Sequence, residues 1–143
     1  MFFGRMKAMV TYFIAPFQPT PDPSTWEKLM RSSSLVIDVA QYRERLTAQW
    51  PHAEFHPNVG NEKLLWTLFE VEDDSLACRG IGTIQSNQQI VTFDSPYIDF
   101  FLWHRVMIPQ EHKLWLFKDT SWNNLEIQSD TKCEEIAQFI KMR

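Results

Sequence analysis

The sequence is poor in the residues that mark several specialised classes of protein. Its 143 residues include only 4 glycines and 2 cysteines, which excludes a collagen-like chain and a domain stabilised mainly by disulfide bonds. No stretch approaches the ~20 uninterrupted apolar residues that cross a bilayer. Positive charge is in the minority, with 14 Lys and Arg against 18 Asp and Glu and a net charge of −4. General binding to nucleic acid, which depends on a cationic surface, is therefore not expected.

The cysteines and the first residues indicate the compartment. Cys78 and Cys133 lie far apart and outside any CxxC or CxxH spacing, so we expect two free thiols, buried as small hydrophobic residues, in a reduced environment. The apolar run from Ala8 to Phe17 is interrupted by polar residues and lacks the cleavage site of a signal peptide. The prediction is a cytoplasmic protein with one domain over residues 1–143, in which residues 1–8 form a flexible extension.

The spacing of the apolar residues, which make up 44% of the chain, predicts the secondary structure. Alternating β-branched and aromatic residues predict strands at Met9–Ile14, His52–His56, Leu64–Val71, Leu76–Ile84, Gln89–Phe93, Leu114–Lys118 and Leu125–Gln128. Helical spacing predicts helices at Thr25–Ser32, from Asp38 to Trp50, at Tyr97–Met107 and after Thr131. This order, β-α-α-β-β-β-β-α-β-β-α, predicts an α+β fold with a mostly antiparallel sheet of six to seven strands and three to four helices.

Capping residues mark where these helices should begin. A hydroxyl or carboxylate followed three residues later by Glu or Gln satisfies free amides at a helix start, and this pattern occurs at Ser24–Glu27, Asp38–Gln41 and Thr131–Glu134. Ser95 followed by Pro96 has the form of an N-cap with proline in the first turn.

The strand Leu64–Val71 is apolar on both faces. Leu64, Trp66 and Leu68 share one face, and Thr67, Phe69 and Val71 share the other. The predicted helices are too few to cover six or seven strands twice. Leaving even two Trp-sized side chains exposed would forgo several kcal/mol, against a net stability of ~5–15 kcal/mol. A homodimer or a ligand groove is therefore expected to cover the remaining apolar surface.

Aromatic residues supply the candidate binding site. Six tryptophans are present, and this residue type dominates binding hot spots although it also fills cores. His104 and Arg105 follow Trp103 at the end of an apolar helix, where the arginine could bind a carboxylate or phosphate or simply favour the helix C-terminus. The candidate binding residues are Trp66, Trp103, His104, Arg105, Trp115 and Trp122; the last lies in a predicted hairpin tip.

Two further motifs contain residue types that occur in metal-binding or phosphate-binding sites. His52, Glu54 and His56 would project from one face of a strand, which makes them weak candidates for a metal site, but a solvated edge strand with Ala53 facing the core explains the same alternation. Gly80-Ile81-Gly82 lies in a strand and predicts a bulge or a close backbone approach, not phosphate binding. No metal, cofactor or catalytic residue is expected.

The element order from Asp38 onward is similar to that of small α+β secretion-chaperone and YbjN-like domains, which pair up and bind protein segments. No motif residue carries this resemblance, so it implies no site. The expected function is a non-enzymatic binding module that self-associates and binds a protein partner, in a chaperone-like or immunity/antitoxin-like manner. The alternative is a small enzyme or ligand-binding domain with a pocket near Trp66, Trp103, His104 and Arg105, or with metal at the His52, Glu54 and His56 set.

Overall fold

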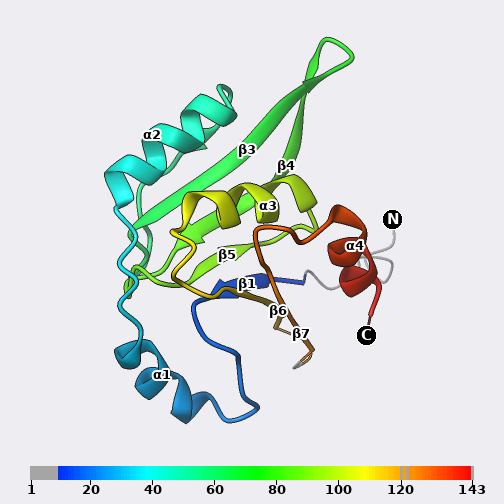
Figure 1. Cartoon of the computed structure of the whole chain (residues 1–143). Helices are drawn as coiled ribbons and strands as arrows, with labels where there is room; N and C mark the ends of the chain where they lie inside the picture. Colours follow the sequence, from blue (N-terminus) through cyan, green and yellow to red (C-terminus); the bar gives the residue numbers. More distant parts are fainter. Residues whose placement is uncertain (1–9, 120, 122, 143) are drawn as a thin grey trace, which may run out of the picture.

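One antiparallel sheet of seven strands forms the centre of the molecule, and four α-helices accompany it in the part of the chain that is described (Figure 1). The structure is a computed structural model, and it describes residues 10–119, 121 and 123–142. The strand order is β2-β3-β4-β5-β1-β6-β7, so the first strand of the chain lies between β5 and β6. The predicted α+β class and order of elements are confirmed. The predicted extension 1–8 and Trp122 lie outside the described residues.

The bounds of the elements follow the predicted pattern closely. The strands are β1 (Tyr12–Ala15), β2 (Glu54–Phe55), β3 (Leu64–Glu72), β4 (Ser75–Ile84), β5 (Val91–Phe93), β6 (Trp115–Lys118) and β7 (Asn124–Glu126). The helices are α1 (Trp26–Ser32), preceded by a 3-10 turn η2 (Pro23–Thr25), then α2 (Val39–Gln49), α3 (Ile98–Met107) and α4 (Cys133–Lys141). Strand β2 is shorter than predicted and keeps only two residues of the predicted strand His52–His56.

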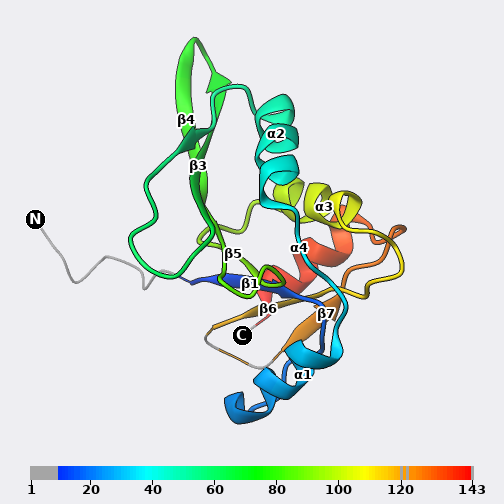
Figure 2. The ribbon, with the colours of Figure 1, turned by 90° about the vertical axis from the view of Figure 1, so that its left-hand side faces the viewer.

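Three helices cover one face of the sheet, which we call the inner face. Figure 2 shows α2, α3 and α4 on the same side of the sheet. Their apolar side chains form the main core with those of the strands. From the helices it contains Tyr42, Leu46, Phe100, Phe101, Ile136 and Phe139, and from the strands Ile14, Leu64, Trp66, Leu68, Ile84, Val91, Phe93 and Leu116. On β3, the residues Leu64, Trp66 and Leu68 face inward, as the alternation predicts.

The opposite face, which we call the outer face, is covered only at its β1–β6 end. There, α1 places Trp26, Leu29 and Met30 against a second apolar cluster that includes Phe117. The Trp26 ring stands edge-on to the Phe117 ring, with centroids 5.6 Å apart. The apolar side of α1 therefore faces the sheet.

Two glycines of β4 let aromatic rings lie directly on the inner face of the sheet. A Cβ atom on Gly82 would lie 2.4 Å from Cζ2 of Trp66, and one on Gly80 would lie 2.5 Å from Cε2 of Phe93. Gly80 also has φ of 152°, and the β3–β4 register shifts between Leu68 and Phe69. The predicted bulge and close backbone approach are both confirmed.

The starts of α1 and α2 show where the capping predictions succeed and fail. Asp38 caps α2 as predicted, since its Oδ1 accepts a hydrogen bond from the Gln41 amide at 3.0 Å. The Ser24 prediction is wrong, because Asp22 Oδ1 accepts from the Ser24 amide at 3.0 Å and caps η2. Pro23 then occupies the first position of that turn, which suits its fixed φ.

The other two predicted caps are displaced by one or two residues. Helix α4 begins after Lys132, whose amide donates to Glu135 Oε1 at 3.1 Å, because Thr131 Oγ1 instead accepts from the Gln128 amide at 2.7 Å. Helix α3 begins after Tyr97, which stands at the N-cap, so Ser95 is not the cap.

The cysteines are free, but their predicted burial is wrong. Cys78 and Cys133 are both exposed. Cys78 pairs with Phe69 in the sheet, and Cys133 is the first residue of α4. Among the described residues, no helix has the length and apolar content that a membrane span requires.

Candidate functional site

The β3–β4 hairpin extends well beyond its neighbouring strands. On one side, β2 pairs only with Trp66 and Thr67 of β3, and on the other, β5 pairs only with Gly82–Ile84 of β4. Residues 68–80 therefore form a two-stranded ribbon, which we call the arm and which projects from the body in Figure 1. A two-stranded hairpin by itself is only marginally stable in water, so the arm needs support from elsewhere.

The tip of the arm is a tight turn of acidic residues. Asp73 and Asp74 have positive φ values of 50° and 65°, the conformation of a two-residue hairpin turn whose twist matches the strands. Ser75 Oγ donates a hydrogen bond to the Glu72 carbonyl at 3.0 Å across the turn. Both aspartates are exposed, so the tip carries a concentrated negative charge.

A bulge near the middle of the arm directs an arginine towards the inner face. Phe69 pairs with Cys78 while Leu68 pairs with Gly80, so Arg79 is the additional residue on β4. Bulges commonly change the direction of a side chain in this way. The Arg79 Nε donates to Glu70 Oε1 at 3.1 Å, and its Nη2 donates to Glu72 Oε2 at 3.0 Å.

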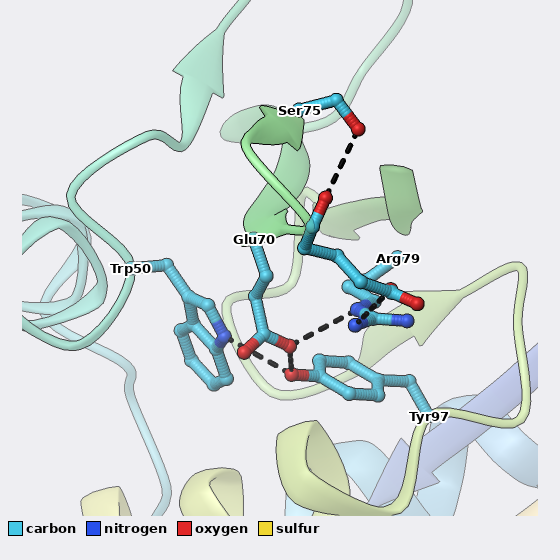
Figure 3. Close-up of polar contacts among 6 residues, drawn as sticks. Trp50, Glu70, Ser75, Arg79 and Tyr97 are labelled. Atoms are coloured by element: carbon cyan, nitrogen blue, oxygen red, sulfur yellow. Dashed lines mark hydrogen bonds and ion pairs between the residues drawn. The ribbon is translucent and has the colours of Figure 1, made fainter. Parts of the chain in front are cut away.

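A polar cluster then ties the inner side of the arm to the body (Figure 3). The Tyr97 hydroxyl, just before α3, donates to Glu70 Oε1. The Trp50 indole, just after α2, donates to the Tyr97 hydroxyl at 3.3 Å. The Arg79 guanidinium lies over the Tyr97 ring, 5.8 Å from its centroid. We call Trp50, Glu70, Arg79 and Tyr97 the polar clamp, because they connect the arm to α2 and α3.

The outer side of the arm and of the adjoining part of β3 and β4 is apolar, and no helix in the described residues covers it. Six side chains of β3 and β4 share this surface, which we call the open face: Leu65, Phe69, Val71, Leu76, Cys78 and Ile81. Val71 is 59% exposed, Leu76 53% and Ile81 43%. Thr83 and Thr92 border the surface and join their hydroxyls at 2.6 Å, whereas Thr67 on the same face is 7% exposed. Among the described residues of β3 and β4 that face this side between Leu65 and Val71, none is charged.

The predicted site residues Trp66 and His104 lie in the core. Both are fully buried. The Tyr42 hydroxyl and His104 Nδ1 are 2.8 Å apart, while His104 Nε2 has no hydrogen-bond partner among the described residues. Burial, with a smaller contribution from the charge of Arg105, lowers the pKa of His104 to about 3. Burial also raises the pKa of Tyr42 well above its usual value, so the pair is neutral at ordinary pH.

Arg105 binds backbone carbonyls. Its Nη1 donates to the His112 carbonyl at 2.9 Å, and its Nη2 donates to the Ile108 and Pro109 carbonyls, each at 3.0 Å. The side chain is 4% exposed. Arg105 therefore satisfies carbonyls of the segment that follows α3, where buried backbone groups require hydrogen-bond partners.

Of the remaining candidate tryptophans, Trp103 lies beside these residues and Trp115 does not. Trp103 is half-buried against the main core, and its ring centroid lies 5.1 Å from that of Tyr42 and 5.3 Å from that of Trp50. Trp115 lies on the outer face of β6 and lines a cavity of about 380 Å³ with Phe17 and residues 32–34. The described part of the predicted set is therefore divided between the core and the outer face of β6.

The histidine motif belongs to the edge of the sheet. His56 Nε2 and Thr67 Oγ1 are 2.8 Å apart, and Glu54 is exposed on the same face. Ala53 and Phe55 pack against the main core, as the edge-strand interpretation predicts. No group of three or more potential metal ligands occurs among the described residues.

Searches against family models, curated proteins and solved structures each find no match for this chain.

Proposed function

We propose that this chain is a non-enzymatic protein-interaction module whose binding surface is the open face. The observation that carries the proposal is a contrast within one hairpin. Leu64, Trp66 and Leu68 on the inner face of β3 are at most 5% exposed, whereas Val71 and Leu76 on the open face are more than half exposed.

The exposure is unfavourable for an isolated chain. Removing a Val, Leu or Ile side chain from water contributes roughly 1.5–3 kcal/mol when burial is complete, and the exposed side chains of the open face forgo about half of this. Contiguous apolar surface of this kind usually marks an interaction site. The side chains share one face and a common boundary of threonines, so a single partner surface can cover them together.

The polar clamp supports the same conclusion. It anchors the inner side of the arm through charge-assisted hydrogen bonds, in which Glu70 accepts from Arg79 and Tyr97. The open face is therefore held in one orientation before any partner arrives. Such preorganisation lowers the entropic cost of association.

The chemistry of the surface indicates the class of partner. An apolar, uncharged centre is suited to an apolar protein surface, and the acidic turn at Asp73 and Asp74 disfavours nucleic acid. This is consistent with the chaperone-like and immunity/antitoxin-like modes of binding that we expect from the sequence.

Site-specific photo-cross-linking in the native cells tests the proposal. We expect a photoreactive amino acid in place of Ile81 to yield a covalent adduct with a protein, and the adduct to disappear when Leu76→Glu is added. The control replaces Val106, which is 72% exposed on α3. Absence of any adduct at position 81, or equal adducts at both positions, would overturn the proposal.

A further inference from the structure

We infer that the occupant of the open face is a second copy of this chain, packed face to face with the two arms antiparallel. This inference rests on the proposed function, because it names the partner of the same surface.

The centre of the open face is complementary to itself. A two-fold dimer brings the same patch of both copies together, so every side chain must tolerate the chemistry of its own surface. Here the patch consists of apolar residues, one thiol and threonines. Neither copy would bury an unpaired charge of the other, which is the most costly mismatch at an interface.

The ends of β3 carry opposite charges, and these select the antiparallel arrangement. Lys63 is exposed immediately before β3, and Asp73 and Asp74 are exposed in the turn after it. The neighbouring Glu62 is directed to its own loop, where its Oε1 accepts from the Val59 and Gly60 amides. Antiparallel packing places each Lys63 near the acidic turn of the other copy, whereas parallel packing would place like charges together.

The position of the symmetry axis follows from these charges. Lys63 and Asp73 are equally distant in sequence from Leu68, so the axis passes close to Leu68 and the neighbouring pair Phe69 and Cys78. Packed sheets lie about 10 Å apart. The two Cys78 thiols therefore face each other across the axis, while Cys133 on α4 lies away from it.

The size of the surface sets the expected affinity. From Leu65 to Val71 the strand spans roughly 20 Å, and the uncharged surface of β3 and β4 is roughly 10 Å wide. A patch of these dimensions is smaller than the standard protein interface and belongs with weak, transient contacts. We expect a dissociation constant on the order of 1–100 µM and a monomer–dimer equilibrium that depends on concentration.

Analytical ultracentrifugation of the purified full chain tests the dimer directly. We expect Leu76→Glu to raise the dissociation constant at least tenfold and the control Val106→Glu to change it less than twofold, with circular dichroism confirming that both variants are folded. Lys63→Glu should also weaken the dimer. Adding Asp73→Asn and Asp74→Asn to that variant should restore part of the loss, because asparagine tolerates positive φ and removes the repulsion.

Chemical cross-linking tests the arrangement. A bismaleimide spanning about 10 Å, the distance between packed sheets, should link two copies of the Cys133→Ser variant through Cys78. It should not link copies of the Cys78→Ser variant. A strict monomer up to about 200 µM, a dimer insensitive to Leu76→Glu, or linkage through Cys133 alone would overturn the inference. The first result, together with a photo-cross-linked adduct to another protein at position 81, would leave the proposed function intact.

Discussion

The outer face of the sheet is closed at one end and open at the other. Phe117 on β6 and Phe69 on β3 both face outward, yet Phe117 is 1% exposed and lies beneath α1, whereas Phe69 is half-buried beside exposed Val71 and Leu76. The two ends share a pattern of apolar residues on both faces. The difference shows that strands with apolar residues on both faces require a second layer to bury their outer side chains. The position of the helices determines whether the same chain provides that layer.

The placement of the helices determines which end is covered. Helix α1 follows β1 after a segment that contains Pro16, Pro19, Pro21 and Pro23. It packs on the outer face at the β1–β6 end, where it covers Phe117. The next helix, α2, packs on the inner face, and all later helices in the described residues join it there. Among the described residues, no helix therefore covers the outer face of the arm.

A charged residue placed on each face of β3 should show most strongly that the inner face is buried and the open face is not. We expect Leu68→Asp to lower the free energy of unfolding by about 4 kcal/mol or more, because it buries an unpaired carboxylate in the core. Val71→Asp, on the open face of the same strand, should change it by less than about 1 kcal/mol in the monomer. Urea unfolding at low protein concentration measures both. Similar losses for the two variants would contradict the assignment of the two faces.

Truncating the two outer-face phenylalanines compares the two ends. Phe117→Ala should cost about 3–5 kcal/mol, the usual effect for a buried phenylalanine. Phe69→Ala should cost roughly 1–2 kcal/mol in the monomer, because less of its surface leaves water on folding. Thermal unfolding measured in parallel checks the ranking. An equal effect would mean that the β3 end is as well covered as the β6 end.

Much of the fold could be predicted because it depends on local pattern. The period-two alternation of β3 assigns Leu68 and Phe69 to opposite faces, and the helical spacing of α1 assigns Trp26 to the sheet. Asp38 marks the start of α2 for a local reason, since its side chain reaches an amide three residues on. These features require no knowledge of which strands become neighbours.

The site required information that sequence spacing does not contain. The arm exists because β2 and β5 are short, and the polar clamp exists because a bulge brings Arg79 opposite Glu70 and α3 then supplies Tyr97. Gly80 was the one local signal for that bulge. Trp66 and Arg105 illustrate a related limit of the sequence. The type of a residue does not show whether its side chain contacts a partner or is buried within its own chain.

Acidification should weaken the inner face through His104. Its native pKa is about 3, against about 6.5 in the unfolded chain. Below pH 6.5 the unfolded state binds a proton that the native state excludes, so stability falls as the pH falls. The loss should approach about 1.4 kcal/mol per pH unit, or roughly 2–3 kcal/mol between pH 6 and pH 4.

A variant separates this effect from the titration of carboxylates. His104→Gln retains a hydrogen-bonding group beside the Tyr42 hydroxyl but cannot titrate. Its unfolding free energy should therefore decrease less steeply between pH 6 and pH 4 than that of the native protein. Identical slopes in urea titrations at matched pH values would show that His104 is accessible to protons in the folded state.

Adding a small group to each face of β4 compares how tightly the two faces are packed. Among these comparisons it should change the free energy of unfolding least. Gly82→Ala introduces a Cβ atom 2.4 Å from the Trp66 ring, and it should cost about 1–3 kcal/mol because the inner face is already filled. Cys78→Val adds bulk to the open face, where there is room, and should change monomer stability by less than about 0.5 kcal/mol. Thermal melts of dilute protein distinguish the two. A larger loss for Cys78→Val than for Gly82→Ala would mean that the open face is already packed within a single chain, and the need for a partner would disappear.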